Sequence, residues 1–242
     1  MTDKWQQAFN DACIENNIKM GLLLNIDTAT ESAGVCLSLG GNILAMEETM
    51  GQKSHASFIQ PAIQRVMQHA GYPLTAVDAI AVTAGPGSYT GLRVGLSTAK
   101  GLCYGLKKSL ILVNTLEVMA FAAIEAFGEK TGDVLFCPMI DARRMEVFTA
   151  IYTPTLGVVS PPSAVILDEN AFQEQLLLQK LVFSGSGSAK ATYIQHRNAL
   201  FSNALYNTKH LAALALLRFN AAKFNNLAYS EPQYLKEFYK KA

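Results

Sequence analysis

The first half of the chain alternates strand patterns with helix patterns. Short, continuous apolar runs at 21–26, 79–84 and 110–113 are typical of buried strands. Residues 35–39 and 43–48 flank a Gly-Gly-Asn turn, which predicts an antiparallel meander with the first strand. A meander followed by alternating helices and strands predicts an α/β half with a mixed sheet.

Helical periodicity separates these strands. Ser54 is expected to cap a first helix, and a second helix follows the strand at 79–84; a third is expected at about 116–127. A row of small residues, Gly91, Gly95 and Ala99, predicts close approach of another helix to the second one. The apolar stripes of the first two helices are Ile59, Ile63, Val66 and Ala70, and then Leu92, Leu96, Ala99, Cys103 and Leu106.

The same order of elements begins again in the second half. Strands are expected at 134–140, 146–153 and 181–184, and Pro161-Pro162 is expected to interrupt regular secondary structure. Phe172, Leu176 and Leu177 indicate a helix, and Thr208 is expected to cap a last one. Two similarly ordered halves suggest a duplicated architecture, although no internal sequence repeat proves it.

A glycine-rich loop links the strand at 79–84 to the second helix. Gly85, Gly87 and Gly91 allow unusual backbone angles and close contacts, and Ser88 lies at the helix start. A strand, a glycine loop and a helix N-terminus form an arrangement that favours an anion. The spacing fits neither the Rossmann fingerprint nor the phosphate-binding P-loop, so a tight structural turn is the competing interpretation.

Composition narrows the class of protein. The 242 residues suffice for one large or two small domains, and the net charge is +1 without a basic cluster. A protein that binds nucleic acid unaided normally has a basic stripe, so such binding is not expected. No apolar run is long enough for a membrane span. Residues 1–19 are polar and are treated as an extension outside the fold.

Cysteine spacing indicates the compartment. Cys13, Cys36, Cys103 and Cys137 lie far apart and form no CxxC pair. This pattern predicts buried thiols in a reducing cytoplasm rather than disulfides or zinc ligands.

Acidic and histidine side chains offer incomplete chemistry. Asp27 ends the first strand, where it is expected either to orient a ligand or to bond the amides of the following turn. No pair among His55, His69, His196 and His210 has the spacing of a helical metal site, and His55 is expected to be a capping or surface residue.

Nucleophilic catalysis has no visible constellation either. The chain has no GxSxG elbow, and no base is evident for Ser88. Asp141, Arg143 and Glu146 form either an acid/base set or ion pairs of a turn, and we favour the ion pairs. No cofactor or metal is expected.

Several motifs together resemble a known family. Five segments occur in the order found in the TsaB (YeaZ) family of bacterial tRNA threonylcarbamoyladenosine biosynthesis. They are LLLNIDTATESAGVCLSL, HASFIQP, GPGSYTGLRVGLSTAKGL, DARRMEV and a late Tyr-Leu pair. The resemblance runs from about residue 20 to 235. It implies an actin-like ATPase (ASKHA, ribonuclease H-like) fold and a role in modifying adenosine 37 of tRNAs that read ANN codons.

The resemblance also implies that the chain is not an enzyme. The related transferase TsaD carries a metal-binding histidine pair, and alignment through Asn114 places Thr115 and Met119 there, with Glu117 between them. A hydroxyl and a thioether are poor ligands for such a metal. The chain is therefore expected to act as a non-catalytic partner of TsaD.

Partners and boundaries follow from the same resemblance. It implies a heterodimer with TsaD, TsaE in a larger complex, a homodimer when the chain is alone, and tRNA only through the complex. The first subdomain is expected at 20–120 with 208–242, and the second at 121–207. Aspartate at Leu96 or Ile63 is expected to dissociate the homodimer and the TsaD complex while leaving the fold intact. The predicted partner surface is Ile59, Ile63, Val66, Leu92, Leu96 and Ala99.

Two other functions remain as alternatives. An ASKHA-type ATPase would use Asp27 and the loop from Gly85 to Gly91 on ATP. The family's old glycoprotease label would require a peptidase nucleophile, base or zinc motif, and the sequence shows none.

Overall fold

The computed structural model describes residues 19–50, 55–128 and 133–236. Their contacts divide the described chain into two units. Unit 1 comprises residues up to 114 together with 207–232, and unit 2 comprises 115–206 together with 233–236. The boundary expected at 120–121 falls inside a helix that unit 2 contains whole.

Unit 1 is built on a five-stranded mixed sheet, as the hydrophobic pattern predicted. The first three strands form the antiparallel meander, and the other two lie parallel to the first. Their order is β3-β2-β1-β4-β5. The bounds are β1 Leu22–Asp27, β2 Ser32–Leu39, β3 Asn42–Met50, β4 Ala79–Thr83 and β5 Ser109–Val113.

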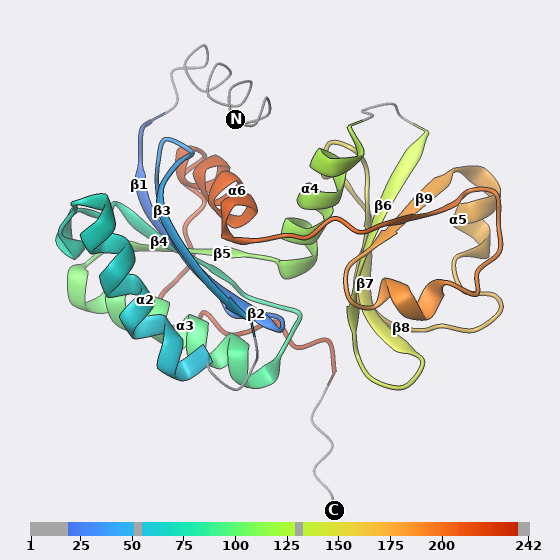
Figure 1. The fold of residues 1–242 in the computed structure, drawn as a ribbon, viewed down its shortest axis with the longest axis horizontal. Coiled ribbons are helices and arrows are strands. Elements are labelled where there is room, and N and C mark those ends of the chain that lie inside the picture. The colour runs from blue at the N-terminus through green and yellow to red at the C-terminus, as the bar shows by residue number, and fades with distance from the viewer. Residues whose placement is uncertain (1–18, 51–54, 129–132, 237–242) are drawn as a thin grey trace, which may run out of the picture. The chain divides into compact units, whose positions relative to one another are not determined.

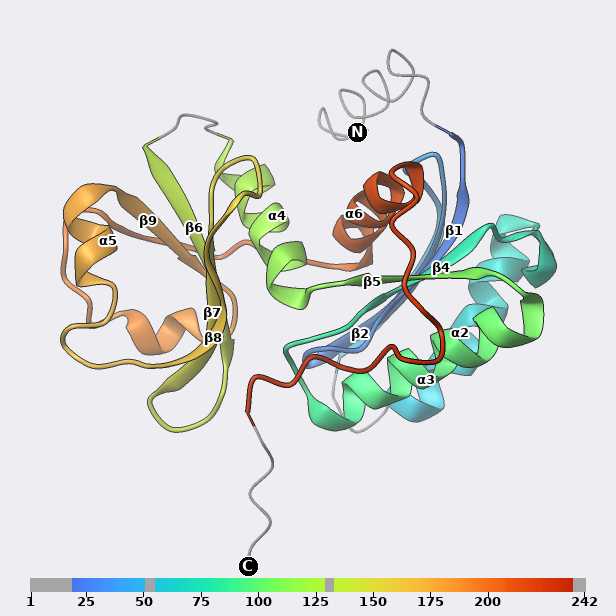
Figure 2. The same cartoon turned by 180° about the vertical axis from the view of Figure 1, so that it is seen from behind.

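Helices cover both faces of this sheet (Figure 1). On one face lie α2, His55–Ala70, and α3, Tyr89–Leu106; on the other lies α6, Thr208–Asn220. Figure 2 shows from behind that the chain after α6 crosses β5, where Asn225 N–H donates to the Leu110 carbonyl at 2.8 Å. The short 3-10 helix Leu74–Ala76 follows α2.

Unit 2 repeats the strand order of unit 1. In each unit the first strand is central, the second and third extend from it antiparallel, and the fourth and fifth lie parallel on its other side. This confirms the duplicated α/β architecture and the actin-like fold class. The bounds are α4 Thr115–Phe127, β6 Val134–Asp141, β7 Glu146–Tyr152, β8 Val158–Ile166, α5 Gln173–Leu178, β9 Lys180–Ser184, the 3-10 helix Ser188–Ala191 and β10 Ala199–Ser202.

Three local predictions were wrong or incomplete. Pro161 and Pro162 lie within β8 and do not end it, because β8 is an edge strand where a missing N–H is tolerated. The short edge strand β10 was not predicted. The cap of α6 is Asn207, whose side chain accepts from Lys209 N–H at 3.2 Å, and the expected cap Thr208 is the first helical residue. The expected cap of α2, Ser54, lies outside the described residues.

Three of the cysteines are free thiols inside the two units, as expected. Burial raises the pKa of Cys36 and Cys137 to about 12 and that of Cys103 to about 11. These thiols are therefore protonated and unreactive at neutral pH. Cys13 lies outside the described residues.

Among the described helices, none has the length and apolar character that crossing a membrane requires.

Candidate functional site

The glycine loop has the strand–loop–helix geometry that the sequence predicted. β4 ends at Thr83, and α3 begins at Tyr89 with Ser88 as its cap. The Ser88 hydroxyl accepts from Gly91 N–H at 3.3 Å, and Ser88 N–H donates to the Ala29 carbonyl at 2.7 Å. Two of the N–H groups at this helix start are thus already bonded within unit 1.

The turn after β1 packs directly on this loop, and this contact explains the glycines. A Cβ at Gly87 would overlap the Ala29 carbonyl, and one at Gly91 would overlap the Thr28 carbonyl. Thr28 Oγ1 also donates to the Gly91 carbonyl at 2.7 Å. The small row of α3 therefore mainly accommodates the turn after β1. The expected approach of another helix is seen at Gly91, where a Cβ would lie 3.3 Å from His55 Nδ1 of α2.

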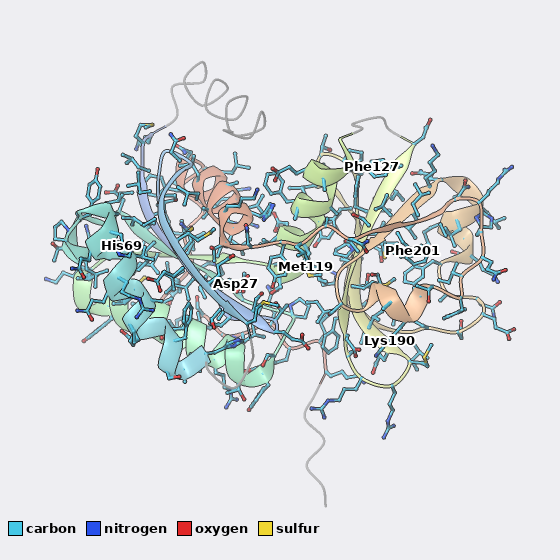
Figure 3. All side chains as sticks on the ribbon, in the orientation of Figure 1. Asp27, His69, Met119, Phe127, Lys190 and Phe201 are labelled. Atoms are coloured by element: carbon cyan, nitrogen blue, oxygen red, sulfur yellow. The ribbon has the colours of Figure 1, made fainter. Side chains whose placement is uncertain are left out.

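Asp27 fastens the same turn to β4. The side chain is 4% exposed, and Oδ1 accepts from Ala29 N–H at 2.9 Å and from the Thr83 hydroxyl at 2.7 Å. Figure 3 labels Asp27 within unit 1. Its contacts are those of the turn-bonding interpretation. The structure thus brings Asp27 and the glycine loop together through residues 28 and 29.

His55 is buried, so the expectation of a capping or surface residue was wrong. Only 2% of the residue is exposed, at the first position of α2. Nε2 lies 3.3 Å from the Glu31 carbonyl, which makes Nε2 the protonated nitrogen. Nδ1 has no partner among the described residues. Two helix starts and the turn after β1 converge here, because a Cβ at Gly91 would lie 3.3 Å from this Nδ1.

The positions aligned with the TsaD histidine pair lie at the start of α4. Thr115 is fully buried and Met119 is 5% exposed. Met119 packs with Leu116 and Ile140 in a core cluster of unit 2 and leaves no space for a Cβ at Gly185. Among the described residues no group of three His, Cys, Asp or Glu side chains is placed to hold a metal ion.

The acidic residues of the 141–146 turn form ion pairs, but not with Arg143. Asp141 pairs with Lys190 at 2.6 Å, and Glu146 pairs with Lys236. The Lys190 hydrogen bond lowers the pKa of Asp141. Arg143 contributes only its N–H, which donates to Asp141 Oδ1 at 2.7 Å. Both lysines are distant in sequence, which is why the turn motif did not reveal them.

The predicted partner surface is buried within unit 1. Each of its six side chains is 4% exposed or less, because the stripes of α2 and α3 face the sheet. Five of the six belong to the core cluster of this unit. As a set these side chains therefore face the core and not outward, so the prediction that they form the partner surface was wrong. The residues concerned are Ile59, Ile63, Val66, Leu92, Leu96 and Ala99.

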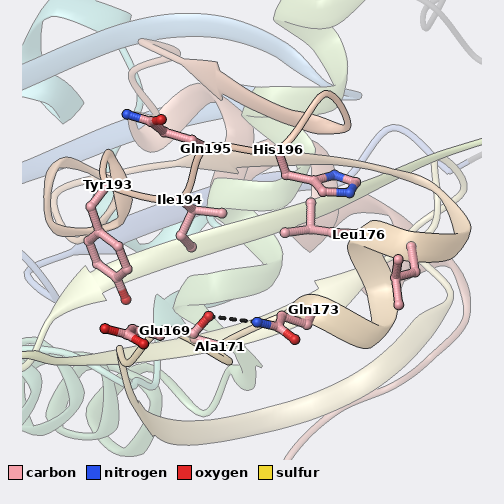
Figure 4. Close-up of a pocket in the computed structure, with 9 residues that line it drawn as sticks. Glu169, Ala171, Gln173, Leu176, Tyr193, Ile194, Gln195 and His196 are labelled. Carbon is pink, nitrogen blue, oxygen red and sulfur yellow. Dashed lines mark hydrogen bonds between the residues drawn. The ribbon is translucent and has the colours of Figure 1, made fainter.

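A cavity of about 300 Å³ lies in unit 2 (Figure 4), and of the residues weighed in the sequence analysis as chemically active it is lined by His196. Its apolar wall comes from α5 and its polar rim from Glu169, Gln195 and His196. His196 Nδ1 accepts from Asn198 N–H at 3.2 Å. No motif marks these segments in the sequence, so pattern analysis had no means of finding the cavity.

Comparisons with known proteins agree with the fold and the motifs. A family model described as "TsaD: tRNA N6-adenosine threonylcarbamoyltransferase" matches residues 47–241. The chain is similar to the Escherichia coli tRNA threonylcarbamoyladenosine biosynthesis protein TsaB, with 38% identity over 130 residues, 54% of each chain. It is also similar to the Haemophilus influenzae protein of that name, with 29% identity over 88% of this chain and 93% of the relative. The match spans about half the length of the E. coli relative.

Solved structures extend the likeness to nearly the whole chain. YeaZ from Pseudomonas aeruginosa superposes with a TM-score of 0.76 at 25% identity, covering 89% of this chain and all of that one. The chain belongs to the family of the tRNA N6-adenosine threonylcarbamoyltransferase model, and within it to the TsaB (YeaZ) group.

Proposed function

We propose that this chain serves the formation of N6-threonylcarbamoyladenosine at position 37 of tRNAs that read ANN codons, as the non-catalytic partner of a TsaD-type transferase. The observation that carries the proposal is the start of α4. Thr115 and Met119, where the resemblance places the transferase's histidines, are buried side chains of unit 2. Neither supplies an imidazole, and Met119 packs in a core cluster of that unit.

The geometry of the glycine loop fits a non-catalytic role better than it fits ATP hydrolysis. An anion-binding loop directs several free N–H groups at its ligand. Here the turn after β1 packs on the loop, and Ser88 N–H donates to the Ala29 carbonyl at 2.7 Å. We infer that the loop and Asp27 now have a structural role.

The partner surface is proposed on the outward side of α2. Gln60, Pro61 and Gln64 are exposed there and line a shallow groove of about 440 Å³, to which Ile63, Met67 and Leu74 also contribute. On α3, Tyr104 is 81% exposed. A TsaD-type subunit, or a second copy of the chain when it is alone, would cover this side of unit 1. A TsaE-type ATPase and the tRNA would join the larger assembly.

Removing the chain from its native cell is expected to lower threonylcarbamoyladenosine in bulk tRNA several-fold, because the transferase loses its partner. Nucleoside mass spectrometry measures the modification directly. Re-expression of the wild-type chain is the control and should restore the original level. An unchanged level after removal would contradict the assigned pathway.

A further inference from the structure

The hairpin between β6 and β7 carries two adjacent arginines at its tip. Arg143 and Arg144 are both exposed. Within the described ranges, neither guanidinium group takes part in an ion pair or a hydrogen bond. Their positive charges are therefore available to a ligand from outside the chain.

The acidic residues of the hairpin do not cancel these charges, because each carboxylate already forms an ion pair with a lysine from another segment. Asp141 pairs with Lys190, which Figure 3 labels, and Glu146 pairs with Lys236. Lys190 also donates to the Glu146 carbonyl at 3.3 Å. Four positive groups against two carboxylates leave a local charge of +2, whereas the whole chain carries +1.

The arginines stand on a short, internally bonded turn. Ala142 N–H donates to the Glu146 carbonyl at 3.1 Å, and Glu146 N–H donates to the Arg143 carbonyl at 3.2 Å. Both arginines adopt left-handed backbone angles, with φ of 69° and 48°. Glycine or asparagine would adopt this conformation at lower cost, so the turn geometry does not explain why arginine occupies both positions.

We propose that Arg143 and Arg144 bind the phosphodiester backbone of tRNA, an inference that rests on the proposed function above. A guanidinium group donates two parallel hydrogen bonds to a phosphate, which makes arginine well suited to this contact. The two Cα atoms are about 3.8 Å apart, and their long side chains reach successive phosphates of one strand. Two such contacts are too few to hold tRNA alone, in keeping with the low net charge, and they add to the surface of the partner.

The turn is less suited to a protein ligand. A stable protein interface buries an apolar centre within about 1,600 Å². Residues 141–146 offer charge and one partly exposed apolar side chain, Met145 at 46% exposure. Backbone phosphates need only the charge and the donors.

The test is the double variant Arg143→Gln/Arg144→Gln, compared with Lys107→Gln/Lys223→Gln, which removes two exposed positive charges from unit 1. Fluorescence anisotropy of a labelled tRNA transcript gives the Kd at several salt concentrations, for the chain alone and for the chain with a TsaD-type subunit. Losing two phosphate contacts should lower the slope of log Kd against log salt by about 1.4 to 1.8, and should weaken binding about 25- to 60-fold at about 0.1 M salt. The lysine control should keep the wild-type slope, and Arg143→Lys/Arg144→Lys should keep most of it.

Three outcomes would overturn the inference. The first is an unchanged slope and Kd in the arginine variant. The second is loss of co-elution with the TsaD-type subunit while tRNA binding per assembled complex stays the same, which would make the turn a protein contact. The third is that the wild-type chain neither binds tRNA alone nor strengthens tRNA binding by the TsaD-type subunit. Failure of the proposed function is separate, because it would appear as unchanged tRNA modification after removal of the chain.

Discussion

Replacing Ile63 by aspartate is expected to unfold unit 1 rather than to detach a partner. Ile63 is 4% exposed and packs in the cluster formed by α2, α3 and the sheet. The variant loses about 1.5–3 kcal/mol of apolar burial and leaves a carboxylate unpaired in the core, which costs several kcal/mol more. Because a whole domain is stable by only about 5–15 kcal/mol, we expect little folded protein. Leu96→Asp should behave alike, since Leu96 is 3% exposed.

Circular dichroism with thermal melting distinguishes the two possibilities. The matched control is Gln64→Asp, one residue further along α2 on its exposed side, which should keep the native spectrum with a stability change within about 1 kcal/mol. Native melting of Ile63→Asp, together with loss of a dimer, would restore the partner surface that we first expected from the sequence.

Adding one methyl group to α3 is expected to have opposite effects at two of its glycines. Gly91→Ala places a Cβ against the Thr28 carbonyl, which is backbone and cannot rotate away, so we expect a loss of about 1–3 kcal/mol or more. At Gly101 nothing lies within 4 Å of the added Cβ. Because alanine favours a helix over glycine by about 0.8–1 kcal/mol, Gly101→Ala should be stabilising.

Urea denaturation of both variants, followed by far-UV circular dichroism, measures this contrast. The midpoint should fall for Gly91→Ala and rise for Gly101→Ala. Equal shifts of the same sign would mean that the turn after β1 does not press on α3 as described.

Hydrophobic period predicted most of the elements but not the direction in which their apolar faces point. The stripe of α2 showed that the helix is amphipathic, and the same pattern is consistent with a sheet or with a partner subunit behind it. Burial of Ile59 and Val66 against the sheet of unit 1 decided the question. Two edge strands of unit 2, β8 and β10, were not predicted from the sequence for a related reason. β8 contains two prolines that only an edge position tolerates, and β10 is four residues long and exists through pairing with β9.

The contacts of the candidate residues in each unit were harder to predict, because they join segments that are distant in the sequence. Asp27 and Thr83 lie 56 residues apart and share a hydrogen bond, and Lys190 reaches Asp141 across 49 residues. Spacing rules detect neighbours along one element, so they marked Gly87 and Gly91 without revealing the Ala29 and Thr28 carbonyls that require them. The sequence allowed either an anion-binding loop or a tight structural turn. The packing of the Ala29 and Thr28 carbonyls against the loop favours the structural turn.

The central claim is that this chain contributes surface and not chemistry to tRNA modification. Its most direct test measures threonylcarbamoyl transfer to a tRNA transcript, from a supplied threonylcarbamoyl donor, with the purified chain alone, with a TsaD-type transferase alone, and with both. We expect no product from the chain alone and several-fold more product from the pair than from the transferase alone. Modified tRNA formed by the chain alone, or a transferase rate that the chain leaves unchanged, would contradict the claim.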